Sequence, residues 1–95
     1  MRRVELRPGA RRDLLRLETF LAKMSPPAAE RRMAWLQSEL QALGAEPQRG
    51  RHFSRQRFEL VLRYRRASYI VRYRVTDDKV TITRIFHGRE DRPPR

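Results

Sequence analysis

The apolar residues of this chain change from a helical to a strand spacing near residue 50, and this change limits the possible folds most. Up to residue 43 they step by four and three, which places them on one face of each of two helices. From residue 58 they alternate, as in strands with one buried face. The helical positions are Ala10, Leu14, Leu17, Leu21 and Met24, then Ala29, Met33, Leu36, Leu40 and Leu43. The pattern predicts a helix hairpin packed on a sheet.

Short signals mark the ends of these elements. Residues 2–6 alternate and predict a first strand, which a Pro-Gly pair ends. Ser25 stands before two prolines, where a serine side chain caps a helix that begins with proline. Gly44 stands where a left-handed glycine commonly ends a helix. Residues 45–57 show little apolar periodicity and predict a loop.

Three strands are expected after this loop. Residues 58–64 and 69–75 each place every second side chain toward the helices. The expected faces of the last strand are Val80, Ile82 and Phe86 against Thr81, Thr83 and Ile85. The fold class is therefore α+β: an N-terminal strand, an antiparallel helix hairpin and a three-stranded antiparallel sheet, in the order β-α-α-β-β-β. One domain is expected over residues 1–95, with residues 89–95 as a flexible tail.

The charge of the chain predicts an anionic partner. The formal net charge is +12, and all but two of the 23 basic residues are arginines, whose planar guanidinium groups grip phosphate or carboxylate in two places. The alternation places Ile70, Arg72 and Arg74 on the exposed face of the sheet, near Arg63. This basic face is either a solvated surface or the place where an acidic partner docks.

The composition also excludes several kinds of site. The chain has no cysteine, which excludes disulfides and thiolate metal sites, and its two histidines are too few for a zinc site built from histidine. No metal or other cofactor is expected. No apolar run approaches the length that a bilayer requires, and the first residues are charged rather than apolar. We therefore expect a cytoplasmic protein with no membrane partner.

The chain resembles the RelE/ParE toxins of type II toxin–antitoxin modules over nearly its whole length. The resemblance rests on the order of elements and on four stretches: SPPAAERRMAWL at the start of the second helix, EPQRGR after it, YIVRYRV as the central strand, and VTITRIFHGRED as the last strand and its exit. It implies a cognate antitoxin, whose acidic C-terminal segment is disordered alone and folds along the toxin surface.

Two activities occur on this fold, so particular residues must decide between them. RelE-like members cut messenger RNA in the ribosome, whereas ParE-like members inhibit DNA gyrase and are not nucleases. The best-known nuclease of the group has cationic residues at the positions that correspond to Glu59, Val61 and Ile70 here, and a tyrosine in a C-terminal helix that has no counterpart here. The resemblance therefore favours a ParE-like inhibitor of DNA gyrase that an antitoxin neutralises.

A nuclease interpretation stays open through His87, because other nucleases of the family use a histidine near the C-terminus. In that alternative, Arg63, Arg72 and Arg89 surround His87 at the ribosome, with Glu59 as a base. A third alternative is a non-toxic nucleic-acid-binding module. In the preferred interpretation no residue is catalytic, and the His-Gly-Arg ending leaves the sheet beside a binding surface. The residues expected to bind the antitoxin or the target are Arg63, Arg72, Arg74, Arg84, His87 and Arg89.

Overall fold

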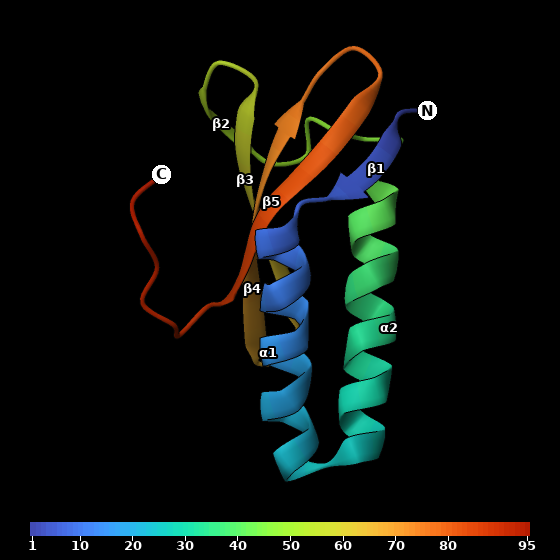
Figure 1. Cartoon of the computed structure of the whole chain (residues 1–95), viewed down its shortest axis with the longest axis vertical. Helices are drawn as coiled ribbons and strands as arrows, with labels where there is room; N and C mark the ends of the chain where they lie inside the picture. Colours follow the sequence, from blue (N-terminus) through green and yellow to red (C-terminus); the bar gives the residue numbers. More distant parts are fainter.

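Two helices lie on one face of a five-stranded sheet in the computed structural model, which describes residues 1–95 (Figure 1). The strands lie in the order β1-β5-β4-β3-β2, with β1 parallel to β5 and all other neighbours antiparallel. The α+β class and the helix hairpin are confirmed. No helix is long and apolar enough to cross a membrane. The elements are β1 (Arg3–Leu6), α1 (Pro8–Met24), α2 (Pro26–Ala42), β2 (Arg51–Ser54), β3 (Arg57–Tyr64), β4 (Ala67–Val75) and β5 (Lys79–His87).

The helix hairpin forms largely as its spacing predicts. The Ser25 Oγ accepts a hydrogen bond of 3.3 Å from the backbone N–H of Ala28 and so caps α2. The five apolar positions predicted for the second helix are all buried: Ala29, Met33, Leu36, Leu40 and Leu43. In α1 the prediction fails at Met24, which is 74% exposed. Met24 ends α1 at the tip of the hairpin, which extends beyond the end of β4 (Figure 1).

The prediction that Gly44 adopts a left-handed conformation is wrong, since no glycine of the chain has a positive φ. The glycine is needed for a different reason. A Cβ at this position would collide with the backbone oxygen of Arg2 and would lie 3.3 Å from a methyl carbon of Val4. The Arg2 N–H donates a hydrogen bond of 2.8 Å to the Gly44 oxygen. Gly44 therefore lets the start of the chain dock against the end of α2.

The segment predicted as a loop contains the short edge strand β2 (Arg51–Ser54), so four strands rather than three follow the hairpin. β2 pairs with β3 across a tight turn in which Gln56 has a φ of 62°. Its sequence, Arg-His-Phe-Ser, is polar and mostly exposed, and therefore gives no apolar period. Short, charged strands of this kind are common at sheet edges, where they discourage pairing with other chains.

The last strand departs from simple alternation because it contains a bulge. Arg84 is paired with Arg72, but Ile82 is paired with Tyr73, so Thr83 is an extra residue in β5. After the bulge, each residue of β5 lies on the opposite face of the sheet from the one that simple alternation predicts. Ile85 joins the core on the helix side, whereas Phe86 lies on the other face, contrary to the expected grouping of Phe86 with Val80 and Ile82.

One buried carboxylate on α1 holds this bulge. Asp13 is 2% exposed, and its oxygens accept hydrogen bonds from the Ile85 backbone N–H (2.8 Å), the Arg84 Nε (2.8 Å) and the Arg16 guanidinium (2.6 Å). Burial by itself raises the pKa of Asp13, but the hydrogen bonds from Arg84, Ile85 and Arg16 outweigh it, so the pKa lies below its ordinary value. Asp13 thus connects the helical layer to the sheet.

The packing of α2 yields a stability prediction. Leu36 is fully buried, so Leu36→Ala should lower the free energy of unfolding by about 2–5 kcal/mol. Leu15→Ala is the matched control, because Leu15 is 63% exposed, and its cost should stay within about 0.5 kcal/mol. Urea denaturation followed by circular dichroism measures both. Equal effects of the two substitutions would contradict the packing of α2 on the sheet.

The Asp13 network predicts a specific acid sensitivity. Because the pKa of Asp13 is lowered in the folded state, its stabilisation is complete above the ordinary aspartate value of about 4 and is lost as the pH falls through the folded value. Asp13→Asn should cost about 1–3 kcal/mol at pH 7 and should show a smaller loss of melting temperature between pH 5 and pH 2. Asp77→Asn, at an exposed turn residue, is the control and should follow the wild-type pH profile.

Candidate functional site

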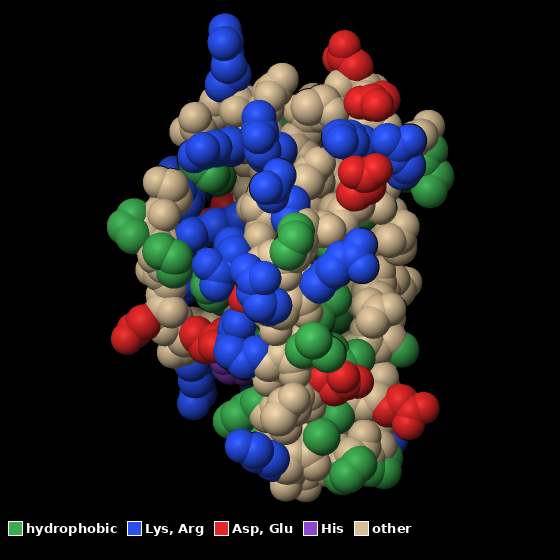
Figure 2. Space-filling view, in the orientation of Figure 1, with side chains coloured by type: hydrophobic (Ala, Val, Ile, Leu, Met, Phe, Trp, Pro, Cys, Tyr) green, Lys and Arg blue, Asp and Glu red, His purple; other side chains and the backbone are tan.

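The sheet face that is turned away from the helices has two chemically different ends. One end is apolar and carries Val61, Ile70 and Phe86, which are cross-strand partners on β3, β4 and β5. The other end carries arginines from the same three strands. Figure 2 shows Lys and Arg side chains gathered beside α1, on the side along which the C-terminal segment runs. We call this face the outer face. Its arginine end is formed by Arg57, Arg72, Arg74 and Arg84.

The apolar end is more enclosed than expected. Ile70 was predicted to be exposed and does lie on the outer face, but it is only 4% exposed because Val61 and Phe86 flank it on the neighbouring strands. The guanidinium carbons of Arg72 and Arg84 lie 5.2 and 4.7 Å from the centre of the Phe86 ring. Val61 remains 47% exposed. This end therefore offers an apolar contact bordered by arginines.

Two of the predicted binding arginines already have acidic partners within the chain. Arg72 donates from Nε to a Glu59 oxygen at 3.0 Å, and the two side chains are only 11% and 15% exposed. Arg84 likewise donates from Nε to an Asp13 oxygen, at 2.8 Å. Arg63 and Arg74 are exposed and form no ion pair. Of these four arginines, Arg63 and Arg74 are therefore the ones free to receive a partner's charge.

His87 does not lie among these arginines. It is the cross-strand partner of Tyr69, and the two rings form an edge-to-face contact with their centres 5.3 Å apart. Tyr69 is fully buried under α2, so His87 lies on the helix side of the sheet. The predicted cluster of His87 with Arg63 and Arg72 is therefore not formed, because the sheet separates them. The reason is the bulge, which changes the face of every later residue of β5.

The His-Gly-Arg-Glu stretch forms a defined turn. The backbone N–H of His87 donates to Glu90, and the His87 Nδ1 accepts from the backbone N–H of Arg89 at 3.1 Å. A Cβ on Gly88 would collide with the Ser68 side chain. Glu90 is held in turn by two hydrogen bonds of 3.0 Å from Arg16. Burial raises the pKa of Glu90, but the bonds from Arg16 and His87 outweigh it and leave the pKa lowered.

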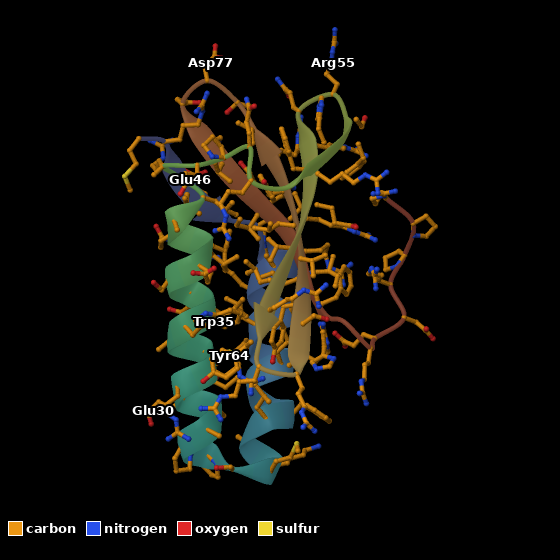
Figure 3. The ribbon with its side chains drawn as sticks, turned by 180° about the vertical axis from the view of Figure 1, so that it is seen from behind. Glu30, Trp35, Glu46, Arg55, Tyr64 and Asp77 are labelled. Carbon is orange, nitrogen blue, oxygen red and sulfur yellow. The ribbon has the colours of Figure 1, made fainter.

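Sequence reasoning missed an aromatic cluster between α2 and the ends of β3 and β4. Trp35 contacts Tyr64 edge to face, with ring centres 4.9 Å apart, and Figure 3 shows the two side chains close together. Arg32 lies 4.0 Å above the Tyr64 ring and donates to the Tyr69 hydroxyl at 2.8 Å. The helical period alone leaves Arg32 on the wet side of α2. Only the position of β3 brings these side chains together.

The helical layer carries a second surface suited to binding. An open groove runs between α1 and α2 and is lined by both apolar and polar residues. Its most exposed apolar residue is Leu15, which the α1 stripe leaves outside the core. Large exposed apolar side chains in a groove commonly mark a site where another chain binds. The apolar residues that line it are Leu6, Leu14, Leu15, Met33 and Leu40.

Known proteins are similar to this chain in sequence and in fold. The family model for the ParE toxin of the type II toxin–antitoxin system parDE matches residues 4–92. Toxin RelE3 of Caulobacter vibrioides is 38% identical over 92 residues, which cover 97% of this chain and all of the relative. Toxin RelE1 of the same organism is 36% identical over 83 residues, 87% of this chain and 89% of that one.

Among solved structures, a chromosomal ParDE TA system from P. aeruginosa has the same fold, with a TM-score of 0.74 at 20% identity over 92% of this chain and 96% of that chain. The residues that the family model matches include both helices, all of the sheet except Arg3, and the turn after β5. The chain therefore belongs to the ParE toxin family of type II toxin–antitoxin systems.

Proposed function

We propose that the protein is a cytoplasmic, ParE-like inhibitor of DNA gyrase, which a cognate antitoxin neutralises. The observation that carries the proposal is the separation of His87 from Arg63 and Arg72 by the sheet. Metal-free RNA cleavage requires a proton-transfer group and cationic groups within reach of one phosphate. His87 and the outer-face arginines do not meet this requirement together.

The outer face supports the same proposal. The positions that hold cationic residues in the best-known nuclease of the group carry Glu59, Val61 and Ile70 here. Glu59 is already bound to Arg72, and Val61 and Ile70 form the apolar end. Each missing donor can cost about 3–4 kcal/mol of transition-state stabilisation. A surface of this composition is better suited to binding a protein than to cleaving RNA.

The alternative is a ribosome-dependent messenger RNA endonuclease of the RelE type. The names of the two curated relatives, Toxin RelE3 and Toxin RelE1, favour it. In that case His87 acts with Arg89, which lines the same pocket on the helix side of the sheet, close to Tyr64 and Arg65. The two activities predict opposite results for the removal of His87.

We further propose that the groove between α1 and α2 receives the antitoxin. The occupant is an amphipathic, acidic segment, because Leu15 and Leu14 offer an apolar strip and the chain carries a net charge of +12. Arg63 and Arg74 are exposed without acidic partners and extend the attraction to the outer face.

The first functional prediction separates gyrase inhibition from RNA cleavage. Purified toxin should inhibit supercoiling by DNA gyrase and should leave messenger RNA intact in a translating extract. His87→Ala should change the inhibitory concentration by less than about threefold, because the ring packs against Tyr69 on the helix side of the sheet, away from the outer face. Deletion of residues 91–95 keeps the Glu90–Arg16 contact and should weaken inhibition if the exit of β5 touches the target.

The opposite pattern would establish the alternative. Messenger RNA cuts at the ribosomal A site that disappear in His87→Ala, with supercoiling unaffected by the wild-type protein, would show that the protein is a nuclease. Arg12→Ala serves as the control in both assays, because Arg12 is exposed on α1 and forms no ion pair.

The second functional prediction concerns the antitoxin. Leu15→Glu should weaken antitoxin binding at least tenfold, since it places a negative charge on the apolar strip of the groove. The melting temperature should stay nearly unchanged, because Leu15 is 63% exposed. Surface plasmon resonance at about 50 and 200 mM salt should also show slower association at the higher salt. A variant that binds as the wild type does would exclude the groove, and an association rate indifferent to salt would exclude the electrostatic contribution.

A further inference from the structure

The arginine end of the outer face forms an open cavity with an unusual lining. Eleven residues line it; six of them are arginines, and none is acidic. The arginines come from the β1–α1 connection, β3, β4, β5 and the C-terminal segment, and β2 adds Phe53. They are Arg7, Arg57, Arg72, Arg74, Arg84 and Arg95. A concave site with this lining attracts anions strongly.

Two of these arginines are held close together without compensation. Arg57 and Arg74 are direct cross-strand partners on β3 and β4, and neither forms an ion pair or a side-chain hydrogen bond. Like charges that face each other across two strands destabilise the sheet. An anion bound between them would remove this repulsion. In the chain alone, the positive charges of these two arginines therefore lack a negative partner.

The aromatic side chains near the cavity are buried or already contacted by arginines. The guanidinium of Arg95 lies 4.9 Å from the centre of the Phe53 ring. Phe86 is covered by Arg72 and Arg84, and Tyr73 is 1% exposed. Proteins that bind single-stranded nucleic acids stack the bases on exposed aromatic rings. The cavity is therefore better suited to the phosphates of a duplex, in which the bases are already paired, than to those of a single strand.

The hydroxyl groups at the cavity are also engaged. The Thr83 Oγ1 donates to the backbone oxygen of Arg72 at 3.0 Å, and the Tyr73 hydroxyl donates to the Pro47 oxygen at 2.8 Å. Because both hydroxyl protons are used within the chain, the guanidinium groups are the main donors left to meet a ligand, and their fork geometry suits phosphates. The apolar side chains at the cavity are Phe53, Pro93 and Pro94, and it has no tryptophan or exposed tyrosine of the kind that commonly anchors a protein partner.

We propose that the arginine cavity of the outer face binds the phosphate backbone of duplex DNA. Duplex DNA carries one negative charge per about 1.7 Å of its axis, so several guanidinium groups can each meet a phosphate. The binding depends on charge and position and is independent of base sequence. It differs from the proposed action on gyrase, and neither requires the other.

The test compares two double variants that remove the same charge. Arg57→Ala/Arg74→Ala removes two of the three cavity arginines that form no ion pair and leaves Arg7. Arg12→Ala/Arg31→Ala removes two exposed helix arginines that also form no ion pairs. Affinity for a fluorescent 20-base-pair DNA duplex is measured by anisotropy between about 50 and 200 mM salt. The cavity variant should bind the duplex at least tenfold more weakly than the wild type. Its slope of log affinity against log salt concentration should be smaller in magnitude by about 2. The control variant should lose less than threefold in affinity.

Several outcomes would overturn the proposal. Equal losses in the two variants would show that only the net charge attracts DNA. Binding of duplex RNA or of single strands at least tenfold tighter than duplex DNA would assign the cavity to another nucleic acid. Displacement of the DNA by a poly-glutamate peptide of equal charge at equal concentration would indicate an acidic protein as the partner. The melting temperature of the cavity variant should stay the same or rise, because Arg57 and Arg74 repel each other; a lower value would show that they support the fold instead.

Discussion

The hydrogen bonds of Asp13 are the interaction on which the rest of the structure depends. This one carboxylate joins α1 to β5 and satisfies the Ile85 backbone N–H beside the bulge at Thr83. Without the extra residue, strict alternation would place Arg84 on the same face as Val80 and Ile82, in the core. The bulge and its carboxylate therefore decide at once which residues of β5 pack against the helices and which arginines reach the outer face.

The same bulge separates two surfaces that the sequence presents as one. Arg84 points to the outer face, together with its cross-strand partner Arg72, whereas His87 returns to the helix side beside Tyr69. The turn after β5 is then held to α1 by Glu90. The His-Gly-Arg-Glu stretch is thus a hydrogen-bonded turn at the exit from the sheet. The separation of His87 from the outer-face arginines is the basis of our proposal that the toxin acts by binding.

The fold uses several of its few carboxylates internally. Asp13, Glu59 and Glu90 each bind at least one arginine, and these pairs shape the outer face and its border. Most of the 23 basic residues are left without a partner in the chain. Pairs of opposite charge within the chain leave its net charge of +12 unchanged. The excess is available to anionic partners, in agreement with a toxin that is stored in complex with an antitoxin.

The sequence alone determined the periodic part of the structure: the two helices, the cap at Ser25 and the inward faces of β3 and β4. These follow from spacing and short-range hydrogen bonding, which depend only on neighbouring residues. It also determined the resemblance to the family and the excess of positive charge. The tertiary structure decided the rest, because β2, the bulge and the burial of Ile70 depend on pairing between distant segments. Alternation cannot reveal an extra residue in a strand, and only the partner strand and Asp13 show on which face His87 lies.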